Sequence, residues 1–253
     1  MLTTGTTSKQ TESKINTNRK TAVIAGTLFI VATTASLLGN SLTGPVLGGP
    51  DYLSSVSSHG NRIIAGALLS FLAAVTSSGI AISLYPVLKK YSEGLAIGAV
   101  GFRLIEGIFY MVGALCLLAL LPVSHQFVSA GTQDASTLQT IGHLLLALND
   151  LAGFVFGVLA FCLGGLMYYL VFYQARLIPR WLSVWGIVAL VLLLTAVFLT
   201  LFDGEPYSVS GNLIFLALPI ALQEMVLALW LIIKGFNSTA PTSESVKPVR
   251  TFA

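Results

Sequence analysis

The chain has 253 residues, of which 55% are hydrophobic and only 9% are charged. About a quarter of the residues of a soluble domain are charged, so this composition excludes an ordinary water-soluble fold and indicates a protein surrounded by lipid. The formal net charge of +3 is small and the basic residues form no dense patch, which excludes a nucleic-acid-binding surface.

The two ends of the chain differ from its middle. Residues 1–18 are rich in Thr, Ser, Lys and Asn and have no hydrophobic period, and residues 237–253 are similarly polar. Segments of this kind bury too little apolar surface to offset the entropy lost on ordering. We therefore predict a disordered cytoplasmic tail at 1–18, a transmembrane domain at 19–236, and a second disordered cytoplasmic tail at 237–253.

The middle of the chain contains six apolar runs, each long enough for the roughly 20 residues that a spanning helix needs. Glycine and proline residues, among them Pro86, Pro122 and Pro179, mark the predicted loops. The first run also resembles a signal peptide, but its length and the alternation of the loops favour an uncleaved helix. The predicted fold class is all-α, an integral membrane bundle of six transmembrane helices. The runs cover residues 21–40, 61–85, 95–121, 138–173, 182–202 and 212–234.

The charges of the loops predict the orientation of this bundle. With six spans, almost every basic residue falls on one side of the membrane, whereas acidic residues dominate the opposite loops, where Arg62 is the nearest basic residue. Basic loops remain in the cytoplasm. We therefore predict a multi-pass cell-membrane protein with both termini cytoplasmic. The basic side holds Lys14, Arg19, Lys20, Lys89, Lys90, Arg176, Arg180, Lys234, Lys247 and Arg250, and the acidic side holds Asp51, Asp134, Asp203 and Glu205.

Four ionisable residues interrupt the apolar runs. Arg103 and Glu106 lie in the third run, Asp150 in the fourth and Glu224 in the sixth. At ~1.5 Å per residue, each lies roughly 13–20 Å from its helix end, close to the middle of the membrane. A central charge costs about 2.5–3.5 kcal/mol on insertion. We therefore predict that the four side chains face the bundle interior and gather in one intramembrane cluster.

Residues at helical spacing extend this candidate site. Tyr110 shares the face of Arg103 and Glu106 with several small residues, and His143 shares the face of Asp150 with Gly153 and Gly157. Small residues let helices approach closely in lipid, so these faces are predicted to point inward, with Tyr110 and His143 as additional members of the site. Three roles remain open for the cluster: a structural network, a pathway for a proton, cation or small molecule, and catalysis.

Other chemistry has little support in the sequence. No metal-binding, haem, nucleotide or hydrolase motif is present, so we predict no metal, no cofactor and no catalytic residue. Cys116 and Cys162 lie in apolar runs near opposite membrane faces and are predicted to be unpaired. Ser77 could line a cavity, but a serine in a membrane helix usually bonds to its own backbone, which is the interpretation we favour. Tyr168 is predicted to join an aromatic belt at the cytoplasmic interface.

Three motifs resemble a known family. The string from Gly101 to Glu106 (GFRLIE), the loop from Leu177 to Gly186, and Glu224 followed by Ala228–Gly235 are similar, in this order, to the bacterial domain-of-unknown-function family 4386. The similarity spans residues ~19 to 236. The resemblance implies a bacterial inner-membrane protein with several helices. Because the family has no established activity, it implies no catalytic residues, but it suggests that Arg103, Glu106 and Glu224 share one role.

Two classes of function follow from these observations. The first is a non-enzymatic membrane protein whose cluster is structural or supports transport or binding of a small molecule or ion. The alternative is an intramembrane enzyme acting on a lipid or small molecule, which requires a nucleophile or metal beside the carboxylates. A sensor or assembly partner is a third possibility. The predicted partners are the lipid bilayer and a small ligand, with no nucleic acid, and the oligomeric state is not indicated.

Overall fold

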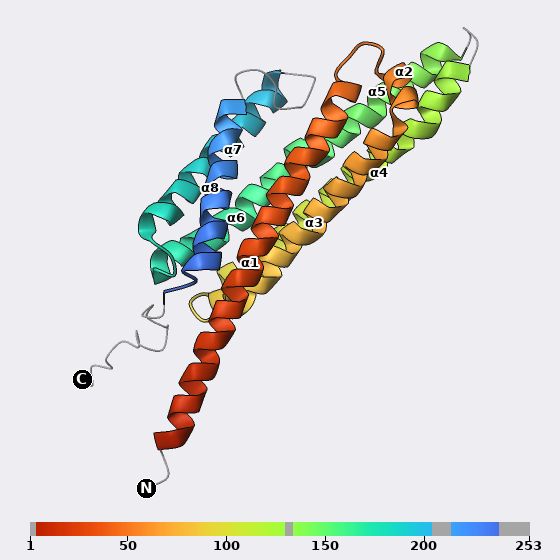
Figure 1. Ribbon diagram of the computed structural model, residues 1–253. Coiled ribbons are helices and arrows are strands. Elements are labelled where there is room, and N and C mark those ends of the chain that lie inside the picture. Colours follow the sequence, from red (N-terminus) through yellow and green to blue (C-terminus); the bar gives the residue numbers. More distant parts are fainter. Residues whose placement is uncertain (1–3, 130–133, 204–213, 238–253) are drawn as a thin grey trace.

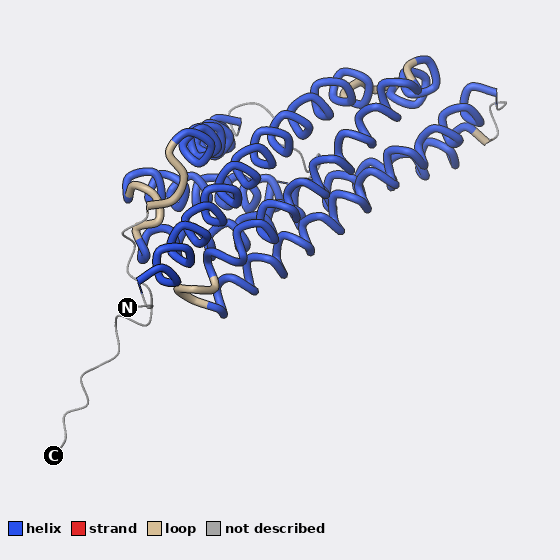
Figure 2. The backbone as a smooth tube through the Cα atoms, turned by 60° about the horizontal axis from the view of Figure 1, so that its bottom comes forward, coloured by secondary structure: helices blue, strands red, loops and turns tan. Residues whose placement is uncertain are grey.

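The computed structural model of the protein describes residues 4–129, 134–203 and 214–237 (Figure 1). These residues form helices joined by short turns, and the described part of the chain contains no strand (Figure 2). The helices are α1 (Thr4–Leu47), α2 (Tyr52–Ser58), α3 (Gly60–Leu88), α4 (Glu93–Ser129), α5 (Ala135–Asp150), η1 (Leu151–Gly157), α6 (Val158–Ala175), α7 (Arg180–Asp203) and α8 (Ile214–Ile233).

Six helical segments among the described residues are long and apolar enough to cross a membrane. Five of the six predicted runs fall within one of them, and the sixth run, 212–234, contains the last of them, Phe215–Ile233, so the prediction of a helical multi-pass membrane protein is confirmed. The fourth segment, Ala135–Ala175, is one continuous helix in which the π-helix η1 separates α5 from α6. The short helix α2 is an addition that the apolar runs did not predict.

Several helices extend beyond the predicted runs. Helix α1 begins at Thr4, so the structure places residues 4–18 in a helix, where we predicted a disordered tail. Pro86 and Pro122, which we expected to mark loops, lie inside α3 and α4. A proline removes only one backbone donor, and α4 continues past Pro122 because this part of the helix packs against α2. Apart from Asn237, the predicted C-terminal tail lies outside the described residues.

The helices form two neighbouring groups (Figure 1). Helix α1 packs against α3, which packs against α4, and α6, α7 and α8 pack in sequence beside them. Helices α1 and α8 are in contact, as are α4 and α6, which closes the two groups into one bundle. The start of α1 and the end of α8 lie at the same end of this bundle (Figure 1). The loops α3–α4 and α6–α7 lie at this end as well.

Apolar side chains fill the bundle at both ends and also cover its outside. Near the end of α8, a buried cluster combines side chains of all six spans, α1, α3, α4, α6, α7 and α8, including Phe29 and Phe172. A second cluster, which includes Val56 and Leu120, joins α2, α3 and α4 at the opposite end. Exposed apolar residues such as Leu115 lie on the outer faces of the helices. An apolar exterior is what a bundle needs when its solvent is lipid.

Candidate functional site

A network of polar side chains is buried at the centre of the bundle around Arg103. The Arg103 side chain is only 1% exposed. Its Nη1 donates to Ser77 Oγ at 2.8 Å and to Glu106 Oε2 at 3.1 Å, while its Nη2 donates to the Tyr168 hydroxyl at 2.7 Å. The guanidinium carbon also lies 4.3 Å from the centre of the Phe161 ring. Charged and aromatic partners therefore surround this cation inside an otherwise apolar bundle.

Two carboxyl groups flank the guanidinium. Glu106, one turn after Arg103 on α4, accepts a hydrogen bond from Ser77 Oγ at 2.8 Å. Glu224 on α8 lies 3.7 Å from Arg103 Nη2 and accepts a hydrogen bond from Thr33 Oγ1 at 3.0 Å. The arrangement gives each carboxyl group both a charged and a neutral partner, which offsets the cost of removing it from water.

This network connects most of the spans. Thr33 belongs to α1, Ser77 to α3, Arg103 to α4, Tyr168 to α6 and Glu224 to α8, so one set of contacts links five helices. We call these five residues together with Glu106 the Arg103 network.

A second set of contacts links the remaining span, α7. Gln223, the neighbour of Glu224 on α8, donates through Nε2 to the carbonyl oxygen of Leu182 on α7 at 3.1 Å. The Tyr169 hydroxyl, on α6, donates to Gln223 Oε1. All six spans are thus connected through buried polar groups.

Asp150 does not join the Arg103 network. Its neighbour Asn149 lies against Gly113 on α4, whereas Gly164, further along α6, lies against Arg103. The ten residues from Arg103 to Gly113 span roughly 15 Å of helix. Because the fourth span is much longer than the membrane requires, the position of Asp150 along the sequence did not predict its depth.

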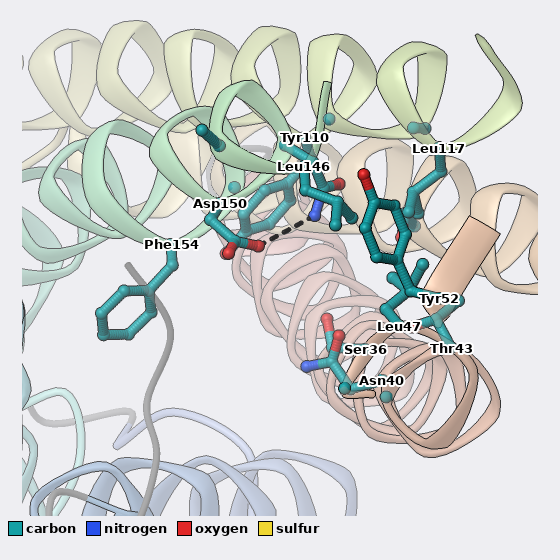
Figure 3. A pocket seen from close by; sticks show the side chains of 18 of the residues that line it. Ser36, Asn40, Thr43, Leu47, Tyr52, Tyr110, Leu117, Leu146, Asp150 and Phe154 are labelled. Carbon is teal, nitrogen blue, oxygen red and sulfur yellow. Dashed lines mark hydrogen bonds between the residues drawn. The ribbon is translucent and has the colours of Figure 1, made fainter. Parts of the chain in front are cut away.

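Asp150 instead lines a cavity of about 820 Å³ that lies between α1 and α5, backed by α3 and α4 (Figure 3). The cavity extends from the loop after α1, at Gly48 and Gly49, to Tyr110 and Val158 near the middle of the bundle. Figure 3 shows Asp150 on one wall and Ser36 and Asn40 of α1 on the facing wall. The volume is typical of sites that hold drug-sized ligands.

Tyr110 and His143, the two additional residues of the predicted site, both line this cavity. Tyr110 stands at its inner end, where its side chain also interacts with the Glu106 carboxyl group. The His143 ring lies 5.3 Å from the ring of Tyr52, near the opposite end. The predicted six-residue site is therefore divided: three residues belong to the Arg103 network and three line the cavity, with Tyr110 at the boundary.

The π-helix η1 forms part of the cavity wall directly after Asp150. Its last residue, Gly157, packs against the Tyr110 ring so closely that an added Cβ would lie 2.8 Å from Tyr110 Cε1. An added Cβ at Gly153 would meet open space. Of the two glycines expected on an inward packing face, only Gly157 makes a close helix contact. Single-turn π segments are frequent at functional sites, and this one adjoins both Asp150 and Tyr110.

In the described part of the chain, no three His, Cys, Asp or Glu residues are grouped to hold a metal ion. Cys116 and Cys162 are free and buried.

The model of a family described as a domain of unknown function (DUF4386) matches residues 24–235. The chain belongs to this family. The resemblance inferred from three motifs is thereby confirmed, and the DUF4386 match contains every residue of the Arg103 network and of the cavity lining. No curated protein and no solved structure matches the chain.

Sequence reasoning missed several polar members of the buried contacts in this DUF4386 chain. Ser77 bonds to Glu106 instead of its own backbone, and Tyr168 is fully buried beside Arg103 instead of lying in an interfacial belt. Thr33 and Gln223 carried no signal at all. Serine, threonine and tyrosine are common in membrane helices, so only their position opposite a charged residue on another helix reveals their role.

Proposed function

We propose that this protein binds a small molecule in the cavity between α1 and α5, as a membrane carrier or receptor without enzymatic activity. The observation that carries the proposal is the cavity itself. It combines a volume of about 820 Å³ with polar side chains of Ser36, Asn40 and Asp150 inside a membrane bundle. Polar groups facing a cavity within a membrane domain are typical of substrate and ion pathways.

The Arg103 network supports this role as a scaffold. Its side chains are buried, they pair with one another, and they connect five helices next to the inner end of the cavity. A buried ion pair that also makes hydrogen bonds to neutral side chains is suited to fixing helix register. Tyr110 touches both regions, so the network holds the inner wall of the binding cavity in place.

The proposal includes a location. We infer a bacterial inner-membrane protein with both termini in the cytoplasm, because the loops that carry the basic residues Lys89, Lys90 and Arg176 lie at the same end of the bundle as the start of α1 and the end of α8. In this orientation, the glycine-rich end of the cavity at Gly48 and Gly49 faces the outside of the cell.

Thiol labelling of intact cells tests the accessibility of the cavity. The variants carry Cys116→Ala and Cys162→Ala to remove the native thiols. Ser70 lines the cavity, while the adjacent Phe71 is 50% exposed on the outer surface of the same helix. A charged, membrane-impermeant methanethiosulfonate reagent should modify Ser70→Cys if, as we propose, water enters the cavity from the outer face.

Phe71→Cys is the matched control, since it lies at nearly the same depth but faces lipid. We expect at least tenfold slower modification at this position. Equal labelling of the two variants, or no labelling of Ser70→Cys in protein that is folded and abundant in the membrane, would contradict the proposed binding cavity.

The positions of the side chains support the alternative, an intramembrane enzyme, less well than they support a binding protein. Ser77 lies beside the carboxyl group of Glu106, as a serine nucleophile would, but the residue is only 3% exposed and its hydroxyl donates to that carboxyl group. Ser77 is also not among the residues that line the cavity. A substrate in the cavity would therefore not reach this hydroxyl.

A further inference from the structure

The charge of the cavity lining points to the class of ligand. Among the described residues that line the cavity, none is Lys or Arg, and Asp150 is its one carboxylate. His143 is the other ionisable group apart from the tyrosines Tyr52 and Tyr110. The lining therefore attracts cations and repels anions.

Asp150 is placed to contact a ligand. It is half-buried, its carboxylate stands on the cavity wall opposite Ser36 and Asn40, and Asn149 Nδ2 donates to its Oδ1 at 3.1 Å (Figure 3). This hydrogen bond orients the carboxylate on the cavity wall. Charge interactions are stronger within the low dielectric of a membrane domain than in water, so an ammonium group at this position would be bound firmly.

The other side chains of the cavity lining indicate what the uncharged part of the ligand is like. Leu117, Leu146 and Phe154 provide apolar contacts, and the Tyr52 and Tyr110 rings add aromatic faces. Aromatic faces bind ammonium and quaternary ammonium groups. A cavity of about 820 Å³ is far larger than a single metal ion or proton requires. The combination fits a molecule with one cationic centre attached to an apolar body.

We propose that the ligand is an organic ammonium cation whose charged group pairs with Asp150. This inference rests on the proposed function, because it names the class of molecule that the same cavity binds. The cation can arrive from water at the outer face or as the amine headgroup of a lipid, and both share the same recognition chemistry.

Three probes of similar shape test the inference on the purified full-length protein in lipid nanodiscs. They are benzyltrimethylammonium, its uncharged isostere neopentylbenzene, and the anion phenylacetate. We expect the cation to raise the thermal unfolding temperature in a saturable manner. The other two should bind at least tenfold more weakly. Asp150→Asn should weaken binding of the cation at least tenfold and leave binding of the neutral probe unchanged.

Asp134→Asn is the control, because it removes an exposed acidic group near the same end of the bundle that does not line the cavity. It should bind the cation like the unmodified protein. Comparable binding of all three probes, or a cation affinity unaffected by Asp150→Asn, would overturn the cation assignment while leaving the cavity as a binding site. If none of the probes binds although Ser70→Cys is labelled from outside, the cation assignment fails but the water-filled cavity stands. If Ser70→Cys is also unlabelled, the proposed function fails as well.

Nanodisc composition separates the two sources of the cation. If an amine lipid occupies the cavity, phosphatidylethanolamine should co-purify with the protein, compete with benzyltrimethylammonium, and be lost in Asp150→Asn. If the cation comes from water, binding should be equal in nanodiscs that contain only phosphatidylglycerol and in those that contain phosphatidylethanolamine. Both results support the inference, and retention of phosphatidylethanolamine by Asp150→Asn at the unmodified level contradicts the lipid source.

Discussion

Arg103 illustrates how a single residue determines the arrangement around it. A guanidinium in hydrocarbon is costly, and here it is surrounded by Ser77, Glu106, Tyr168 and Glu224 from four helices. The planar group with its fixed donors can bind several acceptors at once, which a lysine could not do in the same way. Such a residue cannot be moved within the membrane without leaving other groups unpaired.

The two carboxyl groups should differ in their contribution to stability. Glu106 accepts two hydrogen bonds from Arg103, at 3.1 and 3.4 Å, and one from Ser77, whereas Glu224 lies 3.7 Å from Arg103. Removing one partner of a close buried pair costs about 3–5 kcal/mol. We predict a loss of this size for Glu106→Gln and about 1 kcal/mol for Glu224→Gln, which retains an acceptor for Thr33.

Reversible unfolding in mixed micelles measures both variants. Glu93→Gln, at the exposed start of α4, supplies the control for loss of a carboxylate and should change the free energy of unfolding by less than 0.5 kcal/mol, the order expected of an exposed site. If Glu224→Gln lowered the free energy of unfolding more than Glu106→Gln, the distance of each carboxyl group from Arg103 would not determine its contribution to stability.

In the fourth span, the shape of the helix determines which of its residues face the cavity and which pack against α4. Asp150 ends α5, η1 follows directly, and α6 completes a helix of 41 residues that is much longer than a bilayer requires. The wider turn of a π-helix changes which side chains share a face. In this span, it brings Gly157 against Tyr110 while Gly153 remains open to the cavity.

This difference predicts opposite results for two similar substitutions. In Gly157→Ala, the added methyl group would lie 2.8 Å from the Tyr110 ring and 2.9 Å from the carbonyl oxygen of Ala152. Overpacking of this kind costs about 1–3 kcal/mol. Gly153→Ala is the matched control, since its methyl group meets open space and should leave stability unchanged or slightly raised. Thermal unfolding of the two variants in the same detergent measures the difference, and equal midpoints would contradict this packing of η1.

The sequence predicted the elements better than the contacts between them. Composition and the length of the apolar runs were enough to predict six membrane-spanning helices, because a helix in lipid needs about 20 predominantly apolar residues. The pairing of Arg103, Glu106 and Glu224 also followed from the cost of isolated charge. The depth of Asp150 did not, because an overlong helix can slide by several turns relative to its neighbours. The roles of Thr33 and Gln223 depend on packing that no single helix encodes.

For the whole molecule, contacts between distant segments close the bundle at the end where the termini lie. Arg19, at the start of the first apolar run, donates to the carbonyl oxygens of Leu231 and Ile232 at the end of α8. A cation at this position satisfies carbonyl groups that have no partner within their own helix. Asn237 in turn donates to the carbonyl oxygen of Arg176 in the α6–α7 loop. The first and last spans are thus joined at the basic end of the bundle.

This basic end should lie in the cytoplasm, which fusion reporters can test. Alkaline phosphatase needs disulfides that form only outside the cytoplasm, so we predict that a fusion after Lys234 is inactive in intact bacteria. A fusion after Asp134, at the acidic end of the bundle, should be active at least tenfold above that level. Immunoblots of the membrane fraction normalise the activities to the amount of each fusion. The opposite pattern of activity would show that the bundle has the reverse orientation in the membrane. The glycine-rich end of the cavity would then face the cytoplasm, and the ligand would enter from inside the cell.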